Sequence, residues 1–185
     1  SGHVRVYENN NGTWTQIGND IDGESSYDYS GYSVSLSSDG SVVAIGAYQN
    51  DGGGSNAGHV RLYKNINGTW TQIGSDIDGE GSSDLSGSAV SLSSDGSVVA
   101  IGAYANDGGG TNSGHVRIYE NNNGTWTQIG SDIDGEGSSD YFGYSVSLSS
   151  DGSVVAIGAR YNDGGGYNSG HVRVYENNNG TWTQI

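Results

Sequence analysis

Hydrophobic and polar residues alternate along short stretches of this chain, and apolar residues nowhere recur at helical spacing. Residues 3–7 read His-Val-Arg-Val-Tyr, so the two valines point to one side of an extended strand and the polar residues to the other. Residues 13–17 form a second run, and Asn11-Gly12 between the runs supplies the positive-φ residues of a tight turn. The pattern therefore predicts a β-hairpin with half-exposed strands.

A second predicted hairpin contains one strand without alternation. Residues 33–37 alternate, Asp39-Gly40 predicts a tight two-residue turn, and residues 42–47 read Val-Val-Ala-Ile-Gly-Ala. A continuous apolar strand is typical of a strand that is buried on both faces. Because a lone hairpin is only marginally stable in water, the two hairpins must be covered by neighbours.

The whole pattern repeats every 56 residues, since Gly-His-Val-Arg begins at Gly2, Gly58, Gly114 and Gly170. Self-similarity at such a period indicates a repeat architecture. Stacking four-stranded sheets face to face buries the apolar strand between neighbours, which predicts an all-β fold of the β-propeller type. A β-solenoid is the alternative, although its rungs are usually shorter. The repeats span residues 2–57, 58–113 and 114–169, with a partial fourth at 170–185.

Composition and charge argue against several classes of partner. The 185 residues include 21 acidic and 6 basic ones, which gives a formal charge of −15. No basic patch is available to replace the counterions of nucleic acid, and an anionic membrane surface repels such a chain. No stretch approaches the roughly 18 apolar residues of a membrane span. The acidic composition, rich in Ser, Asn, Gly and Thr, favours an extracellular or cell-surface location.

One segment of the third repeat resembles a known family. Phe142-Gly-Tyr-Ser-Val, followed by Val-Val-Ala-Ile-Gly-Ala at residues 154–159, is similar to the FG-GAP repeat of integrin α-subunit β-propellers. The resemblance covers the chain, although Phe-Gly occurs only once and the usual proline after Gly-Ala is absent. In the register of the family the blades run over about 30–73, 86–129 and 142–185, preceded by an extra hairpin at 1–17.

Three blades do not close a ring, because closed propellers have about four to eight blades. An open end exposes unpaired strand edges and an apolar blade face, and both favour association. The predicted partner is therefore a further copy of the same repeats, in a longer array or in a complex of chains. The hairpin that is duplicated at both ends would serve as an overlapping or exchanged element.

Each repeat also carries an acidic loop before its second hairpin, with carboxylates at positions 1, 3, 5 and 9. Calcium prefers six to eight oxygen ligands, often from alternating acidic residues on a glycine-containing loop. The calcium loops of FG-GAP propellers have this spacing, although they join the first two strands of a blade. Calcium is the candidate cofactor, and a solvated loop that keeps the protein soluble is the alternative. The resemblance implies the ligands Asp20, Asp22, Glu24 and Asp28; Asp76, Asp78, Glu80 and Asp84; and Asp132, Asp134, Glu136 and Asp140.

Three other side chains recur once per repeat. Tryptophan in Thr-Trp-Thr-Gln could stack on sugars, although packing at a seam between blades is the preferred interpretation. Asn-Gly-Thr is an acceptor for N-glycosylation, which matters only in a eukaryotic secretory pathway. The histidines are expected to be packed or at the surface, because no second metal ligand lies nearby in sequence. The residues are Trp14, Trp70, Trp126 and Trp182; Asn11, Asn67, Asn123 and Asn179; and His3, His59, His115 and His171.

Catalysis is not expected, because nearly every polar residue recurs in each copy and an active site needs an asymmetric set of groups. The predicted function is a non-catalytic extracellular module for adhesion, surface structure or self-assembly, with calcium as a candidate stabiliser. Two alternatives stay open: a lectin-like propeller that binds glycans, and a designed or consensus symmetric propeller.

Overall fold

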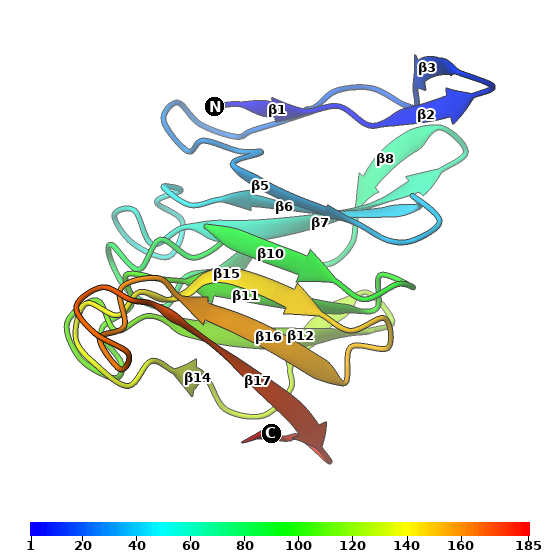
Figure 1. Ribbon diagram of the computed structural model, residues 1–185. Coiled ribbons are helices and arrows are strands. Elements are labelled where there is room, and N and C mark those ends of the chain that lie inside the picture. The colour runs from blue at the N-terminus through cyan, green and yellow to red at the C-terminus, as the bar shows by residue number, and fades with distance from the viewer.

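The chain forms three large antiparallel β-sheets of one design, stacked face to face, and two two-stranded sheets near its N-terminus (Figure 1). The computed structural model describes residues 1–185, which lie in strands and loops, and it contains no helix of the kind that crosses a membrane. In each sheet four strands pair in chain order, so the fold is the predicted propeller with three blades. The blades contain β5 (Ser33–Leu36), β6 (Val42–Ala47), β7 (His59–Ile66) and β8 (Thr69–Gln72); β10 (Ala89–Leu92), β11 (Val98–Ala103), β12 (His115–Asn122) and β13 (Thr125–Gln128); and β15 (Phe142–Leu148), β16 (Val154–Ala159), β17 (His171–Asn178) and β18 (Thr181–Gln184).

A shorter hairpin precedes the first blade, as predicted. Its strands are β2 (Tyr7–Asn10) and β3 (Thr13–Gln16), which pair with each other. Asn11 and Gly12 in the turn have φ angles of 52° and 92°. Two successive residues in this left-handed region are the signature of the mirror-image turns that suit the twist of a hairpin. The Asn-Gly pair therefore forms the tight hairpin turn that the sequence predicts.

The turn of the second hairpin occupies the four residues between the predicted strands, but Asp39-Gly40 does not form a two-residue turn. Gly40 has a φ of 71°, but Asp39 keeps a negative φ, and the nitrogen of Ser37 donates to the oxygen of Val42 across a four-residue loop. Asp39 accepts hydrogen bonds from the hydroxyl of Ser37 and from the nitrogen of Ser41. The bond from Ser41 is the main cause that lowers the pKa of Asp39 to about 2. The two-residue turn is therefore wrong, because the aspartate side chain organises a wider loop.

The second strand of an inner blade is buried on both faces, as its continuous apolar sequence predicts. In β6 every residue is buried. Val42 and Ala44 belong to the core shared with the next blade, whereas Val43 and Ile45 belong to the core shared with the N-terminal segment. In β16 buried and half-buried residues alternate instead, because no further blade covers its outer face.

The third strand shows how strongly burial depends on neighbours. Residues 3–7 alternate between exposed and covered positions, as predicted. The same pattern at His59, Arg61 and Tyr63 in β7 is buried on both faces. The half-exposed prediction therefore fails for the inner blades, where the N-terminal segment or the preceding blade covers the polar side as well.

A glycine near the end of each second strand allows the blades to approach closely. A Cβ atom added to Gly46 would overlap the carbonyl oxygen of Gly87 in the next blade, and one added to Gly102 would overlap that of Gly143. At Gly158, in the last blade, the added atom would meet only the side chain and backbone of Ser145 in its own blade. The glycines are thus required where a blade follows.

Serine side chains join the first strands of successive blades, which lie side by side without a shared backbone ladder. The nitrogen of Leu92 donates to Ser35 Oγ, and the nitrogen of Leu148 donates to Ser91 Oγ, both at 3.0 Å. These bonds satisfy part of the exposed strand edges, which are otherwise prone to pairing with other chains.

Each acidic loop adds a short strand to the blade before it. β9 (Ile77–Asp78) pairs with the first residues of β7, and β14 (Ile133–Asp134) pairs with those of β12. β4 (Ile21–Asp22) pairs in the same way with β1 (His3–Val4). The outer edge of β7 is therefore shared between β8 of its own repeat and β9 of the following loop.

Candidate functional site

The carboxylates of an acidic loop contact different partners. In the second loop, Asp76 accepts a hydrogen bond from the glutamine four residues earlier, Glu80 lies 3.4 Å from the guanidinium of Arg117, and Asp84 accepts from Asn106 at 2.9 Å. The other loops repeat this arrangement: Asp20 with Gln16 and Arg5, Glu24 with Arg61, and Asp28 with Asn50; then Asp132 with Gln128, Glu136 with Arg173, and Asp140 with Asn162.

The carboxylates at the third position lie in the short strands that bridge blades. Asp22, Asp78 and Asp134 stand opposite a histidine in the ladder. No acidic loop brings three of its own four carboxylates within 4.8 Å of one another. Calcium coordination needs such convergence, so the loops as they stand do not fit the ion, and calcium stays a prediction from the spacing.

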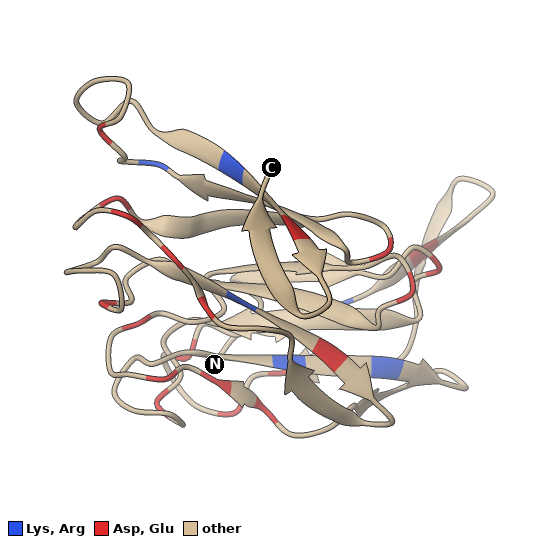
Figure 2. Cartoon of the chain, turned by 90° about the horizontal axis from the view of Figure 1, so that it is seen from below, with Lys and Arg blue, Asp and Glu red and all other residues tan.

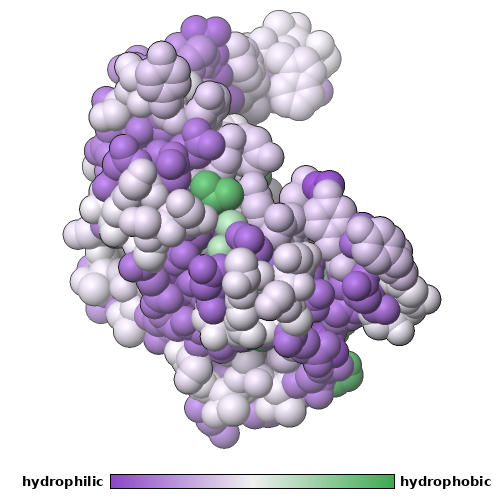
Figure 3. Space-filling view, turned by 90° about the vertical axis from the view of Figure 1, so that its left-hand side faces the viewer, coloured by the Kyte–Doolittle hydropathy of each residue, from purple (hydrophilic) through white to green (hydrophobic).

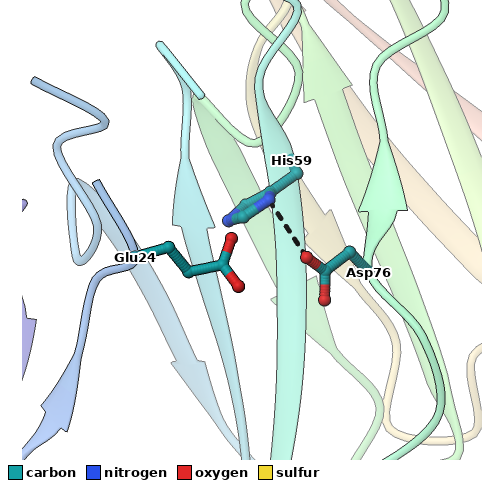
Figure 4. Close-up of side chains that lie close together, drawn as sticks. All are labelled: Glu24, His59 and Asp76. Atoms are coloured by element: carbon teal, nitrogen blue, oxygen red, sulfur yellow. Dashed lines mark ion pairs between the residues drawn. The ribbon is translucent and has the colours of Figure 1, made fainter. Parts of the chain in front are cut away.

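Residues from three separate segments meet instead where the N-terminal segment joins the first blade (Figure 4). Glu24 comes from the first acidic loop, His59 from the start of β7, and Asp76 from the second acidic loop. Their ligand atoms lie within 4.8 Å of one another, and His59 Nδ1 is 3.5 Å from Asp76 Oδ2. Glu80, His115 and Asp132 form the same group at the next junction. The fold thus gives these histidines carboxylate neighbours that are distant in sequence.

A buried arginine turns each group into a charge network. Arg61 is 6 % exposed, and its Nη1 lies 3.2 Å from Glu24 while its Nη2 donates to the backbone oxygen of Asp22. Arg117 repeats these contacts with Glu80 and Asp78. A guanidinium beside a carboxylate opposes the binding of a cation there. Figure 2 shows that acidic residues lie mostly in loops, whereas Lys and Arg are few. Sequence reasoning missed these arginines as partners of the loops.

Burial also keeps the two inner histidines neutral. Desolvation lowers the pKa of His59 and of His115 below the usual value of 6.5, although nearby carboxylates act in the opposite direction. Burial raises the pKa of Glu80. The junctions therefore combine an uncharged imidazole with a carboxylate–guanidinium pair.

We expect the protein to lose stability as the pH falls from 7.5 to 5.5. An unfolded histidine takes up its proton near pH 6.5, whereas the folded one does so only at lower pH, so the unfolded state binds more protons in this range. The stability that comes from the neutral folded histidine is fully present above the pKa of the unfolded state. It is lost as the pH falls from that value through the lower pKa of the folded state. Urea unfolding midpoints at both pH values measure the loss, which should be smaller in His59→Gln. An equal loss in parent and variant would contradict this account.

The inner tryptophans lie at the seams between blades. The Nε1 atoms of Trp70, Trp126 and Trp182 donate to the carbonyl oxygens of Ile17, Ile73 and Ile129, each at 2.9 Å. A polar pocket of about 340 Å³ beside Trp126 is lined by Tyr119, Asp76 and Asp78, and it recurs beside the other two. Trp14 is 65 % exposed.

The asparagines of Asn-Gly-Thr are exposed at the hairpin turns, with φ angles near 52°.

Tyrosines gather at the loop end of the blades, a feature that sequence reasoning missed. The ring centroids of Tyr32 and Tyr48 are 4.3 Å apart, and Tyr104 of the second blade lies 5.5 Å from Tyr144 of the third. The guanidinium of Arg160 stacks over Tyr144 at 4.5 Å. The only signal in the sequence is that the repeats differ from one another at these positions.

The comparisons agree with this arrangement of blades. The model of the FG-GAP repeat matches residues 21–63 and 131–175. Both segments are FG-GAP repeats. The first match runs from β4 to the middle of β7 and the second from the third acidic loop to the middle of β17, so each matched segment covers two strands of a blade and the first part of the third. Among curated proteins, none matches the chain in sequence.

Several solved structures share the fold. A putative 6-phosphogluconolactonase from Bacteroides uniformis is similar with a TM-score of 0.62 and 16% identity, over 99% of this chain and 46% of that chain. A putative 6-phosphogluconolactonase from Bacteroides fragilis gives 0.56 and 16%, over 82% and 36%. Sqt1 from Saccharomyces cerevisiae gives 0.54 and 16%, over 86% and 35%. At such identity the likeness shows the fold alone, and this chain spans less than half of each of these proteins.

Proposed function

We propose that this chain is a non-catalytic structural module whose blades associate end to end with another copy of the same chain. The observation that carries the proposal is the uncovered face of the third blade. Val172 is 67 % exposed, whereas Val60 and Val116, at the same position of the inner blades, are fully buried. Exposed apolar faces of this kind mark association surfaces.

The uncovered face of the third blade has the same features that contact the next blade in the first two blades. A pocket of about 420 Å³ is lined by Tyr144, Gly158 and Val172, among others. Gly158 corresponds to Gly46 and Gly102, against which the next blade places a glycine carbonyl. The start of β17 also lacks the short strand that β9 gives to β7. A second copy would supply both through its first blade and its first acidic loop.

The same hairpin sequence occurs before the first blade and again in the third blade. Residues 1–17 and 169–185 have the same sequence. The C-terminal hairpin of one copy could therefore take the place of the N-terminal hairpin of the next without any loss of matched contacts. Exchange of identical elements is a low-cost route to association. In the joined state, Trp70 of the next copy would donate to the carbonyl of Ile185, as it does to Ile17 within one chain.

The composition of the chain supports a location outside the cell. We place the module outside the cell because of its acidic composition, rich in Ser, Asn, Gly and Thr. Repeated identical surfaces suit multivalent contact, in which weak sites add through effective concentration. Calcium binding and adhesion stay predictions. An enzymatic activity is not proposed, because the polar groups at the blade junctions recur symmetrically.

Sedimentation of the whole chain over a wide concentration range tests the association. We expect dimers and longer species that grow with concentration. Val172→Asp should weaken association at least tenfold, because it places a charge on the uncovered face. Ile66→Asp is the matched control, since Ile66 is 51 % exposed on the outer hairpin of the first blade and the net charge changes equally. A parent that stays monomeric at the highest concentration, or equal association of both variants, would overturn the proposal.

A further inference from the structure

The three full repeats differ mainly at one end of the blades. They differ at 14 of 56 aligned positions, and ten of these fall in two segments, residues 25–33 and 48–57 of the first repeat and their equivalents. Tyr29 from the first segment stacks near Tyr48 from the second at 5.7 Å, so the two variable segments meet. Variable loops on an invariant β-scaffold are typical of recognition surfaces.

Four of the variable residues, Tyr27, Tyr29, Ser30 and Tyr32, line a pocket in the first repeat. Its volume is about 550 Å³, within the range of small-molecule sites. Tyr27, Tyr29 and Tyr32 form its aromatic wall, with Ser1, Ser26 and Ser30 beside them and two glycines. No acidic or basic side chain lines it. Figure 3 looks onto this end of the molecule, which is curved and hollowed on one side.

The backbone does not require tyrosine at these positions. Tyr27 and Tyr29 have φ angles of 72° and 56°, in the left-handed region that a bulky residue rarely occupies. In the second repeat Ser83 and Leu85 adopt the same conformation, with φ angles of 70° and 60°. Tyr27 is 78 % exposed, so core packing does not require its ring either. Neither the backbone conformation nor core packing therefore requires the ring of Tyr27, and the backbone does not require that of Tyr29.

We propose that this pocket binds a neutral saccharide. Aromatic rings offer apolar faces against which a sugar ring can lie, and the tyrosine and serine hydroxyls offer donors and acceptors for its hydroxyl groups. A charged ligand would find no counter-ion in the lining, and the net charge of −15 repels an anionic sugar. The site goes beyond the proposed association and belongs to the unassociated chain, because the joined state would place Gly158 of a neighbouring copy against Gly31 in the lining.

Titration calorimetry and saturation-transfer NMR on the whole chain, with cellobiose, lactose and N,N′-diacetylchitobiose as probes, test the site. At least one disaccharide should bind saturably. The triple variant Tyr27→Ser, Tyr29→Leu and Tyr32→Ser should bind at least tenfold more weakly. This variant installs the residues of the second repeat, which already fold with the same backbone. Tyr167→Ser is the matched control, because Tyr167 is 89 % exposed in a loop of the third repeat and lies outside the pocket.

Four outcomes would overturn the inference. They are no binding of any of the three probes, equal binding by parent and triple variant, equal weakening by Tyr167→Ser, and preferential binding of sialyllactose or of an arginine-containing peptide over the neutral sugars. An unchanged urea midpoint in the triple variant separates loss of the site from loss of the fold.

Discussion

Gly102→Ala is expected to lower the free energy of unfolding by about 3 kcal/mol or more. The added methyl group would overlap the carbonyl oxygen of Gly143 and come within 3.4 Å of Ala89 Cβ. The carbonyl belongs to the backbone of the next blade, so it cannot move without separating two sheets whose shared core includes Val116, Ile118 and Phe142. Urea unfolding at low protein concentration measures the loss.

Gly158→Ala is the matched control, because it makes the same change at the same position of the last blade. There the added methyl meets the flexible hydroxyl of Ser145 and no following blade. Its cost in the monomer should stay below about 1 kcal/mol, since only a side chain must rotate. The same variant should block association, because in the joined state the position would face a neighbouring blade. Equal destabilisation by both substitutions would show that contact between blades is not the cause.

Phe142→Ala is expected to cost about 3–5 kcal/mol, as is usual for truncation of a buried aromatic residue. Phe142 is 2 % exposed, belongs to the core between the second and third blades, and meets Tyr175 edge-on with ring centroids 6.3 Å apart. Thermal or urea unfolding measures the effect.

The equivalent residue of the second blade provides the control. Ser86 is fully buried, and its hydroxyl has no hydrogen-bond partner. Because an unsatisfied buried hydroxyl is costly, Ser86→Ala should leave stability unchanged or raise it by about 1 kcal/mol. Substantial destabilisation by Ser86→Ala would mean that the hydroxyl is satisfied in solution, and a small effect of Phe142→Ala would mean that its core can collapse.

Local chemistry made much of the fold predictable from the sequence. The Asn11-Gly12 turn follows from the left-handed preference of those residues, and the double burial of residues 42–47 follows from an apolar run that no single face can hide. The Asp39-Gly40 turn was not predictable from dipeptide preference, because the loop is set by hydrogen bonds from two serines to the carboxylate of Asp39. Burial of His59 and Arg61 depends on the first acidic loop, which belongs to the preceding repeat.

The candidate sites were less predictable for the same reason. Spacing within an acidic loop places four carboxylates close in sequence, but it does not reveal that Glu80 pairs with Arg117 of the next repeat or that Asp76 lies beside His59. The tyrosine pocket is formed by residues that differ between the repeats, whereas a search for motifs finds only residues that recur. Comparison of each repeat with its neighbours, position by position, is the signal that points to it.

The strands β9 and β14 make each blade depend on the one that follows it. When the second blade unravels, β7 loses its pairing with β9, so the first blade is left with a frayed edge at His59 and Val60. Tandem repeats commonly melt in steps, with stability given by a sum over neighbours. Here β9 and β14 pair with the preceding blade and so strengthen the coupling between neighbours. We therefore expect thermal denaturation to unfold all blades in one cooperative transition. A surface built from such units would yield to pulling all at once, without a ladder of intermediate extensions.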